Sequence, residues 1–169
     1  MVKKYVLVIV EDQQLLKAGV SALAMPDMTL EIAGSADNYI DTLRLVEHYK
    51  PDLVLMDMSV LGNQGIKAIS LIKRSGRGSK ILILTSQKSD EHLRLSLKAG
   101  ADGYMVKDIA VDELRIAIRT VLHGRLHLSP DITDIVINGY LLSGHITGSQ
   151  SVARTETLHA RAVQLRIVK

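Results

Sequence analysis

The stretch PDLVLMDMSV, residues 51–60, contains a short buried strand that ends on a carboxylate. Residues 53–56 form an apolar run of the kind seen in parallel strands that are buried on both faces. Asp57 follows that run directly, with no polar residue between them. One interpretation is that Asp57 only terminates the strand, because Asp favours turns. That interpretation becomes weaker if charged groups also end the other strands.

On both sides of this stretch, apolar runs alternate with segments of helical period. The runs predict strands at 5–10, 30–36, 53–56, 81–84 and 103–106. The periodic segments predict helices over 15–23, 38–49, 65–75, 90–99 and 111–123. Five strands that alternate with five helices indicate an α/β fold, in which crossover connections build a parallel sheet with helices on both faces.

Polar side chains stand where several of these strands end. The first strand ends in Glu11 and Asp12, the third in Asp57, the fourth in Thr85 and the fifth in Lys107. The carboxyl ends of parallel strands meet at one edge of a sheet, and ligands bind outside that edge. Three carboxylates, one hydroxyl and one ammonium at a single edge argue against a turn-only role for Asp57.

These groups suit phosphoryl chemistry with a divalent cation. Clustered carboxylates repel one another unless a cation neutralises them, and Mg²⁺ prefers oxygen ligands, including phosphate oxygens. Asp12 and Asp57 are candidate ligands, with Glu11 adjacent or acting through water. An Asp carboxylate can also act as a nucleophile that forms an aspartyl-phosphate. Lys107 would then offset the phosphoryl charge, and the Thr85 hydroxyl would contact a phosphoryl oxygen.

Four segments carry a resemblance to a known family: VLVIVEDQQLLKAGV, PDLVLMDMSVLGNQG, KILILTS and LKAGADGYMVKD. In this order and spacing they resemble the receiver domain of two-component response regulators, over about residues 4–125. The resemblance implies a doubly wound, five-stranded parallel sheet of flavodoxin-like order 2-1-3-4-5. It also implies a cytoplasmic phosphoacceptor switch, which receives its phosphoryl group from a sensor histidine kinase and is not a turnover enzyme.

The resemblance assigns roles at the sheet edge. Asp57 resembles the phosphoacceptor, and a Mg²⁺ site is implied at Glu11, Asp12, Asp57 and the backbone carbonyl of Ser59. Thr85 resembles the switch hydroxyl and Lys107 the conserved-type lysine of the family. Tyr104 resembles the aromatic that rotates inward upon phosphorylation.

Further features of the family concern tuning and dimerisation. Ser59 and Gln87 flank the pocket, at positions that can tune dephosphorylation in the family, although a neutral surface role fits these residues equally well. Helix 90–99, strand 103–106 and helix 111–123 form the expected partner or homodimer face. Val60-Leu61-Gly62 departs from the usual Met-Pro-Gly after the phosphoacceptor, but the change removes no chemical group.

The segment GADGYMVKD, with Asp108 in place of the commoner Pro, resembles the LuxR/NarL-type subfamily. In that subfamily the receiver usually precedes a helix-turn-helix DNA-binding domain. The segment SPDITDIVINGYL, residues 129–141, fits its linker helix, with Ser129 as N-cap and Pro130 at the first helical position. The sequence thus predicts a receiver over 1–125, a linker helix over 126–144 and a basic tail over 145–169.

The net charge of +3 falls entirely in residues 145–169, which hold four basic residues against Glu156. That tail shows no recognition-helix pattern and is expected to be disordered or weakly helical, so no specific DNA binding by this chain alone is expected. The chain has no Cys, which excludes disulfides and cysteine metal sites. Its apolar runs are too short to span a membrane, so no membrane partner is expected.

Two alternatives remain open at this point. One is a phosphatase with an aspartyl-phosphate intermediate, although neither Glu11-Asp12-Gln13 nor Asp57-Met58-Ser59 matches the D-x-D pattern of enzymes that resemble haloacid dehalogenases. The other is a stand-alone receiver that acts through protein–protein contacts. Multiple turnover on a phosphate ester would favour the enzyme, whereas one stable phosphoryl group per chain would favour a switch.

Overall fold

The computed structural model describes residues 2–23, 25–76, 78–108 and 110–142, with side chains as far as Ile137. The chain divides into a unit of residues 1–134 and a second unit of residues 135–169. Helix α7, Pro130–Leu142, begins in the first unit and continues into the second. The predicted boundaries at 125 and 144 stay predictions, and the basic tail lies outside the described residues.

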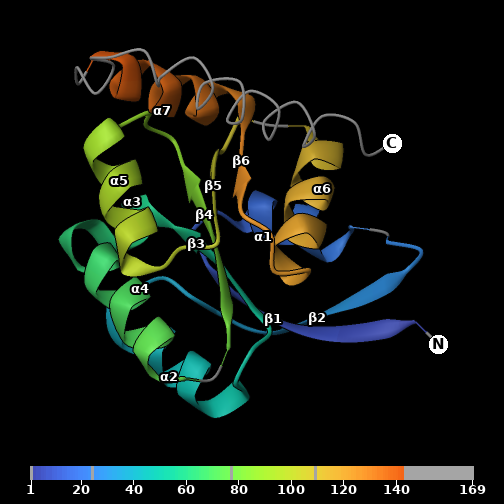
Figure 1. Ribbon diagram of the computed structural model, residues 1–169. Coiled ribbons are helices and arrows are strands. Elements are labelled where there is room, and N and C mark those ends of the chain that lie inside the picture. The colour runs from blue at the N-terminus through green and yellow to red at the C-terminus, as the bar shows by residue number, and fades with distance from the viewer. Residues whose placement is uncertain (1, 24, 77, 109, 143–169) are drawn as a thin grey trace. The chain divides into compact units, whose positions relative to one another are not determined.

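The first unit contains one parallel sheet with strand order β2-β1-β3-β4-β5-β6 (Figure 1). Its strands are β1 Lys3–Val10, β2 Met28–Ala36, β3 Leu53–Asp57, β4 Lys80–Thr85, β5 Gly103–Val106 and β6 His127–Leu128. Its helices are α1 Gln14–Ser21, α2 Tyr39–Tyr49, α3 Met58–Leu61, the 3-10 helix η1 Gly62–Gln64, α4 Gly65–Arg74, α5 Asp90–Ala99 and α6 Val111–Leu122. The predicted doubly wound fold and its 2-1-3-4-5 order are confirmed.

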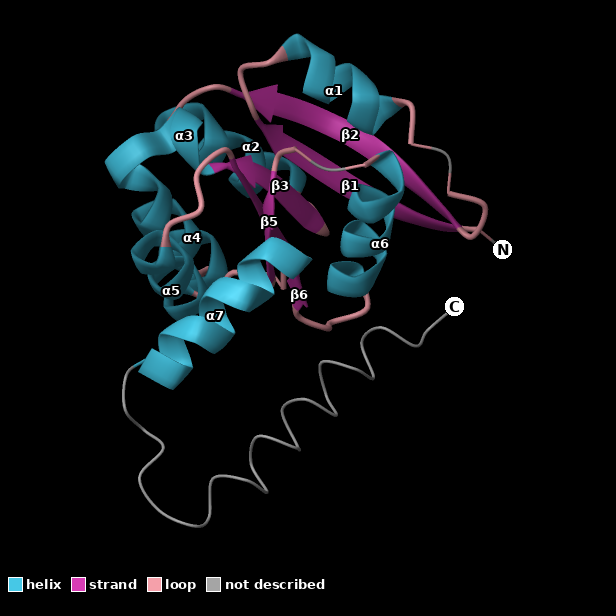
Figure 2. Cartoon of the chain, turned by 90° about the horizontal axis from the view of Figure 1, so that it is seen from above, coloured by secondary structure: helices cyan, strands magenta, loops and turns pink. Residues whose placement is uncertain are grey.

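Helices cover both faces of this sheet, with α1 and α6 on one side and α2, α4 and α5 on the other (Figure 2). Successive strand residues point to opposite faces, so the central strands are apolar throughout. Leu7 and Ile9 of β1 pack with Val20 of α1 and Ile118 of α6 in one core cluster. This two-sided burial holds the carboxyl ends of β1, β3, β4 and β5 at one edge.

Two features differ from the five-strand expectation. A sixth strand, β6, pairs in parallel with β5 through Gly103↔His127 and Tyr104↔Leu128. A strand of two half-buried residues has no measurable alternation, so the sequence pattern does not show it. The segment after Asp57 also forms the short helix α3 and the turn η1 before α4 begins.

Helix ends carry side-chain caps and a glycine stop. The Asn38 side chain accepts a hydrogen bond from the Asp41 N–H at the start of α2, and α5 ends at Gly100, whose φ is 107°. Helix α7 begins at Pro130 as expected, although no described group bonds to the buried Ser129 hydroxyl. Among the described helices, none is long and apolar enough to cross a membrane.

Candidate functional site

Asp57 is both the last residue of β3 and the N-cap of α3. Its side chain is 1% exposed. Its Oδ1 accepts a hydrogen bond of 2.9 Å from the Ser59 N–H, and its Oδ2 accepts one from the Ser59 hydroxyl. The carboxylate therefore does terminate the strand by capping the helix that follows. That local role leaves open what else its oxygens contact.

Lys107, which follows β5, reaches across β4 to that carboxylate. Its Nζ lies 2.6 Å from Asp57 Oδ2 and 2.8 Å from Glu11 Oε2. Burial by itself lowers the pKa of Lys107, but the hydrogen bonds and charges of Asp57 and Glu11 outweigh that effect and leave its pKa raised. The ammonium group therefore stays charged at neutral pH, beside two buried carboxylates.

The carboxylates of Glu11, Asp12 and Asp57 form the acidic cluster at this edge. One oxygen from each lies within 4.8 Å of the others, with Glu11 and Asp57 buried and Asp12 exposed. Opposite ligands of an octahedral Mg²⁺ stand about 4.2 Å apart, since each metal–oxygen bond is about 2.1 Å. Three hard oxygen donors gathered this closely suit such a cation in kind, and Asp12 lies on the exposed side of the cluster.

Thr85, the last residue of β4, is buried, and its hydroxyl bonds to the following turn. Thr85 Oγ1 accepts from the Gln87 N–H at 3.1 Å and donates to the Gln87 carbonyl at 3.0 Å. The Thr85 carbonyl accepts from the Lys107 N–H at 2.8 Å, which joins the two strand ends. The hydroxyl predicted to contact a phosphoryl group is therefore paired with Gln87 in this structure.

Tyr104 of β5 already lies inward and is 0% exposed. Burial raises the pKa of its phenol, and an interaction with the Thr85 side chain offsets part of that rise. Among the described groups, none meets hydrogen-bond geometry with the phenol oxygen. The structure thus places Tyr104 next to the Thr85 side chain, in the inward position that the family resemblance predicts after phosphorylation.

Sequence reasoning missed the bond that the Ser59 hydroxyl makes to Asp57. The prediction concerned its backbone carbonyl and a tuning role, whereas the structure shows its N–H and its hydroxyl both bonded to Asp57. The bond from the Ser59 N–H is the Asx-type cap that an Asp at a strand end indicates, whereas the bond from the Ser59 hydroxyl has no such signal in the sequence. The role of the Ser59 carbonyl as a metal ligand stays a prediction.

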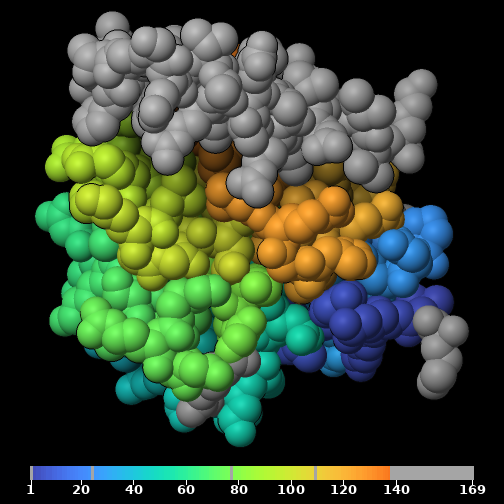
Figure 3. Space-filling view, in the orientation of Figure 1, coloured from blue at the N-terminus to red at the C-terminus, as the bar shows by residue number. Residues whose placement is uncertain are grey.

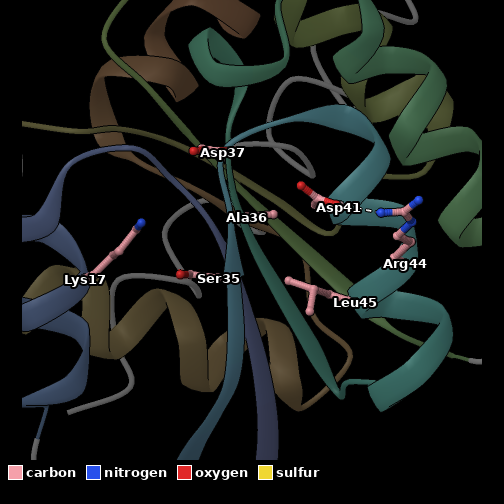
Figure 4. A pocket seen from close by; sticks show the side chains of 7 residues that line it. All are labelled: Lys17, Ser35, Ala36, Asp37, Asp41, Arg44 and Leu45. Atoms are coloured by element: carbon pink, nitrogen blue, oxygen red, sulfur yellow. Dashed lines mark hydrogen bonds and ion pairs between the residues drawn. The ribbon is translucent and has the colours of Figure 1, made fainter.

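A separate pocket of about 350 Å³ lies beside the end of β2. Figure 4 shows Lys17 of α1 on one side of it and Asp41 and Arg44 of α2 on the other. It is lined by Lys17, Ser35, Ala36, Asp37, Asp41, Arg44 and Leu45. None of the predicted site residues lines it, so the carboxylate edge and this pocket are different features.

Comparison with known proteins gives consistent matches. The sequence profile described as the response regulator receiver domain matches residues 7–119. The response regulator GacA of Pseudomonas aeruginosa is 34% identical over 124 residues, which cover 73% of this chain and 58% of that protein. The oxygen regulatory protein NreC of Staphylococcus aureus is 29% identical over 160 residues, covering 94% of this chain and 74% of that protein.

A solved structure also resembles the fold closely. The two-component response regulator of the LuxR family from Aurantimonas sp. SI85-9A1 superposes with a TM-score of 0.74 at 27% identity. The superposition covers 82% of this chain and 99% of that chain. Because the chain spans less than two thirds of the length of GacA, activities of whole regulators do not transfer to it directly.

Proposed function

Because this chain belongs to the family of response regulator receiver domains, LuxR type, we propose that Asp57 accepts a phosphoryl group from a sensor histidine kinase. The observation that carries the proposal is the contact of Lys107 Nζ with both Asp57 Oδ2 and Glu11 Oε2, at 2.6 and 2.8 Å. The ammonium lies beside a carboxylate that can act as a nucleophile, where it can also contact an incoming phosphoryl group.

In the proposed reaction an Asp57 carboxylate oxygen attacks the phosphorus of a phosphohistidine. The new P–O bond forms as the P–N bond to the imidazole breaks, and the imidazole keeps that electron pair. Lys107 offsets the negative charge that gathers on the phosphoryl oxygens. The Ser59 N–H, now 2.9 Å from Asp57 Oδ1, keeps the carboxylate oriented for the attack.

We assign the cation site to the carboxylates of Glu11, Asp12 and Asp57, with the Ser59 carbonyl as a further ligand. A bound Mg²⁺ would neutralise charge on the carboxylates and on the phosphoryl oxygens. Asp12 is the exposed member of this cluster and lies on its open side. Asp12→Asn should therefore weaken Mg²⁺ binding, because a neutral amide is a poorer ligand for a hard cation.

The proposed switch begins at Thr85. Its hydroxyl exchanges both bonds with the Gln87 backbone for a bond to a phosphoryl oxygen, and the turn after β4 rearranges. The inward position of Tyr104 is the one that we expect after this step. Ser59 and Gln87 flank the phosphoryl group in this arrangement and would influence how fast water removes it.

The face built by α5, β5 and α6 is the proposed partner or dimer surface. Figure 3 shows the surface that α4 (green), α5 (yellow-green) and the α6–β6 region (orange) share on one side of the first unit. Ile116 and Val111 of α6 are large apolar residues that remain exposed. Phosphorylation should change hydrogen exchange in residues 85–119 or the oligomeric state, and an unchanged result in both measurements would contradict the proposed switch.

The test of the chemistry is intact-mass analysis after incubation with Mg²⁺ and acetyl phosphate. Wild type should gain one phosphoryl group and Asp57→Asn none. Asp90→Asn makes the same chemical change at an exposed position in the first turn of α5 and should label like wild type. Equal labelling of Asp57→Asn and wild type would exclude Asp57 as the acceptor.

The same samples separate a switch from a phosphatase. A receiver holds one phosphoryl group per chain and releases it slowly, whereas an enzyme with an aspartyl-phosphate intermediate turns over a phosphate ester many times. Phosphate release that continues far beyond one equivalent on a stable monoester would favour the enzyme. We propose the switch, with turnover limited to its own aspartyl-phosphate.

A further inference from the structure

The first turn of α7 is attached to β5 through main-chain contacts. Strand β6 lies beside β5, and the Ser129 N–H donates to the Tyr104 carbonyl at 3.2 Å. The N–H groups of Ile132 and Thr133 both donate to the Ser129 carbonyl, and Ile132 is 0% exposed. The start of α7 is therefore fixed to the backbone of the residue that carries the switch aromatic.

A second attachment joins the same turn to the loop after β4. Lys88 Nζ lies 2.7 Å from Asp131 Oδ2 in the first turn of α7. Lys88 follows Gln87, whose backbone holds the Thr85 hydroxyl by two hydrogen bonds. The group that binds the Thr85 hydroxyl and the group that binds α7 therefore belong to consecutive residues.

The ion pair is exposed on both sides, with side chains 51% and 58% accessible. Exposed pairs contribute little to global stability and are screened by salt. Such a pair suits a contact that must break easily, since a small change in the loop is enough to lose it. Residues 131 and 88 belong to the same unit of the chain, so the contact lies within one body.

We propose that the loop of residues 86–88 and the first turn of α7 form a latch that phosphorylation of Asp57 opens. While Thr85 bonds to Gln87, Lys88 is held against Asp131 and the turn 129–134 stays docked. When the Thr85 hydroxyl leaves Gln87 for a phosphoryl oxygen, the loop relaxes, the ion pair is lost and the turn 129–134 opens more often, although its main-chain bond to β5 remains. This inference rests on the function proposed above and adds how phosphorylation of Asp57 would change the first turn of α7.

Hydrogen exchange of residues 129–134 in the full chain measures the latch directly. In wild type, phosphorylation with Mg²⁺ and acetyl phosphate should speed exchange there about two- to fivefold, the range that loss of one exposed ion pair supports. Lys88→Met keeps the apolar stem but removes the charge, and it should show the faster exchange without phosphorylation. Thr85→Val, which lacks the hydroxyl that holds Gln87, should do the same.

Lys4→Met is the matched control. Lys4 forms a comparably exposed ion pair with Glu31, between β1 and β2, and its loss should leave exchange in residues 129–134 unchanged. Salt gives a second comparison, because about 1 M NaCl should speed exchange there in wild type but not in Lys88→Met. Exchange in β1 and β3 reports whether each variant is folded.

The outcomes separate this inference from the proposed function. No mass gain in wild type would count against phosphorylation of Asp57, while Lys88→Met and Thr85→Val would still test the latch in the unmodified chain. A normal mass gain with unchanged exchange at 129–134 in wild type, Lys88→Met and Thr85→Val would overturn the latch and leave the phosphoacceptor intact. Accelerated exchange in Lys4→Met equal to that in Lys88→Met would also overturn it, because the effect would not be local.

Discussion

Asp57 shows how one residue can serve both structure and chemistry. It caps α3 by accepting the Ser59 N–H, which is the ordinary reason for an Asp at a strand end. Its second oxygen accepts from Lys107, whose side chain comes from 50 residues further along the chain. The capping bond orients the carboxylate toward the ammonium, so the local role prepares the proposed chemical one.

Lys107 supports a prediction about cation binding. Its raised pKa keeps the ammonium charged at pH 7, where it occupies the same carboxylates that a cation would bind. Lys107→Met should therefore bind Mg²⁺ more tightly than wild type, by on the order of tenfold, because one competing positive charge is removed. Titration calorimetry at pH 7 measures this directly.

Lys73→Met provides the control for that measurement. Lys73 also pairs with a carboxylate, that of Asp102 at 2.7 Å, but Asp102 precedes β5 and so lies toward the opposite edge of the sheet. Loss of the Lys73 charge should therefore leave Mg²⁺ affinity unchanged. Weaker binding by Lys107→Met than by wild type would mean that the ammonium organises the carboxylates instead of competing for them.

At the scale of elements, the β4–β5–β6 edge depends on a close approach at Gly103. A Cβ there would lie 2.6 Å from Leu82 Cδ1, 2.9 Å from Val121 Cγ2 and 3.2 Å from the His127 carbonyl. The absence of a side chain allows β5 to sit against β4, α6 and β6 at once. Strand β6 and the start of α7 therefore depend on this glycine.

Gly103→Ala should lower the free energy of unfolding by about 1–3 kcal/mol, the usual cost of overpacking a core position. Gly19→Ala is the paired change within α1, where a Cβ meets nothing within 4 Å. It should raise the free energy of unfolding by about 0.5–1 kcal/mol, because Ala loses less backbone entropy than Gly in a helix. Urea unfolding of both variants gives the two values, and equal effects would contradict the packing argument.

At the scale of the whole molecule, charge is distributed unevenly along the chain. The chain holds 21 basic and 18 acidic residues, and residues 145–169 contain four of the basic ones and one acidic one. The remaining 17 basic and 17 acidic residues balance. Any attraction to a polyanion is therefore expected from the tail and not from the receiver surface as a whole.

The tail predicts weak DNA binding that does not depend on base sequence. Four basic groups neutralise at most about four phosphates, so affinity should fall roughly 10²-fold between 50 and 200 mM salt. Deleting residues 145–169 should abolish the binding and leave labelling of Asp57 intact. A salt titration with mixed DNA fragments tests this, and tight, sequence-selective binding at physiological salt would reveal a DNA-binding element that sequence reasoning missed.

The sequence by itself determined the parallel α/β fold, the strand ends and the residues at their common edge. It could do so because long apolar runs and helical periods report burial locally, and parallel strands with crossover helices must bring their carboxyl ends together. Asp57, Glu11 and Lys107 meet for that reason, although they lie far apart in the chain.

Only the tertiary structure decided which atoms pair at that edge and what lies beyond it. Three contacts lie in short polar segments that have no hydrophobic period. They are the bond from the Ser59 hydroxyl, the attachment of Thr85 to Gln87 and the Lys88–Asp131 ion pair. The sequence does not predict strand β6 either. Its two residues form a strand only because the edge of β5 offers them backbone hydrogen-bond partners. Contacts of this kind depend on distances that arise after the sheet and its helices have packed, so no pattern in the sequence predicts them.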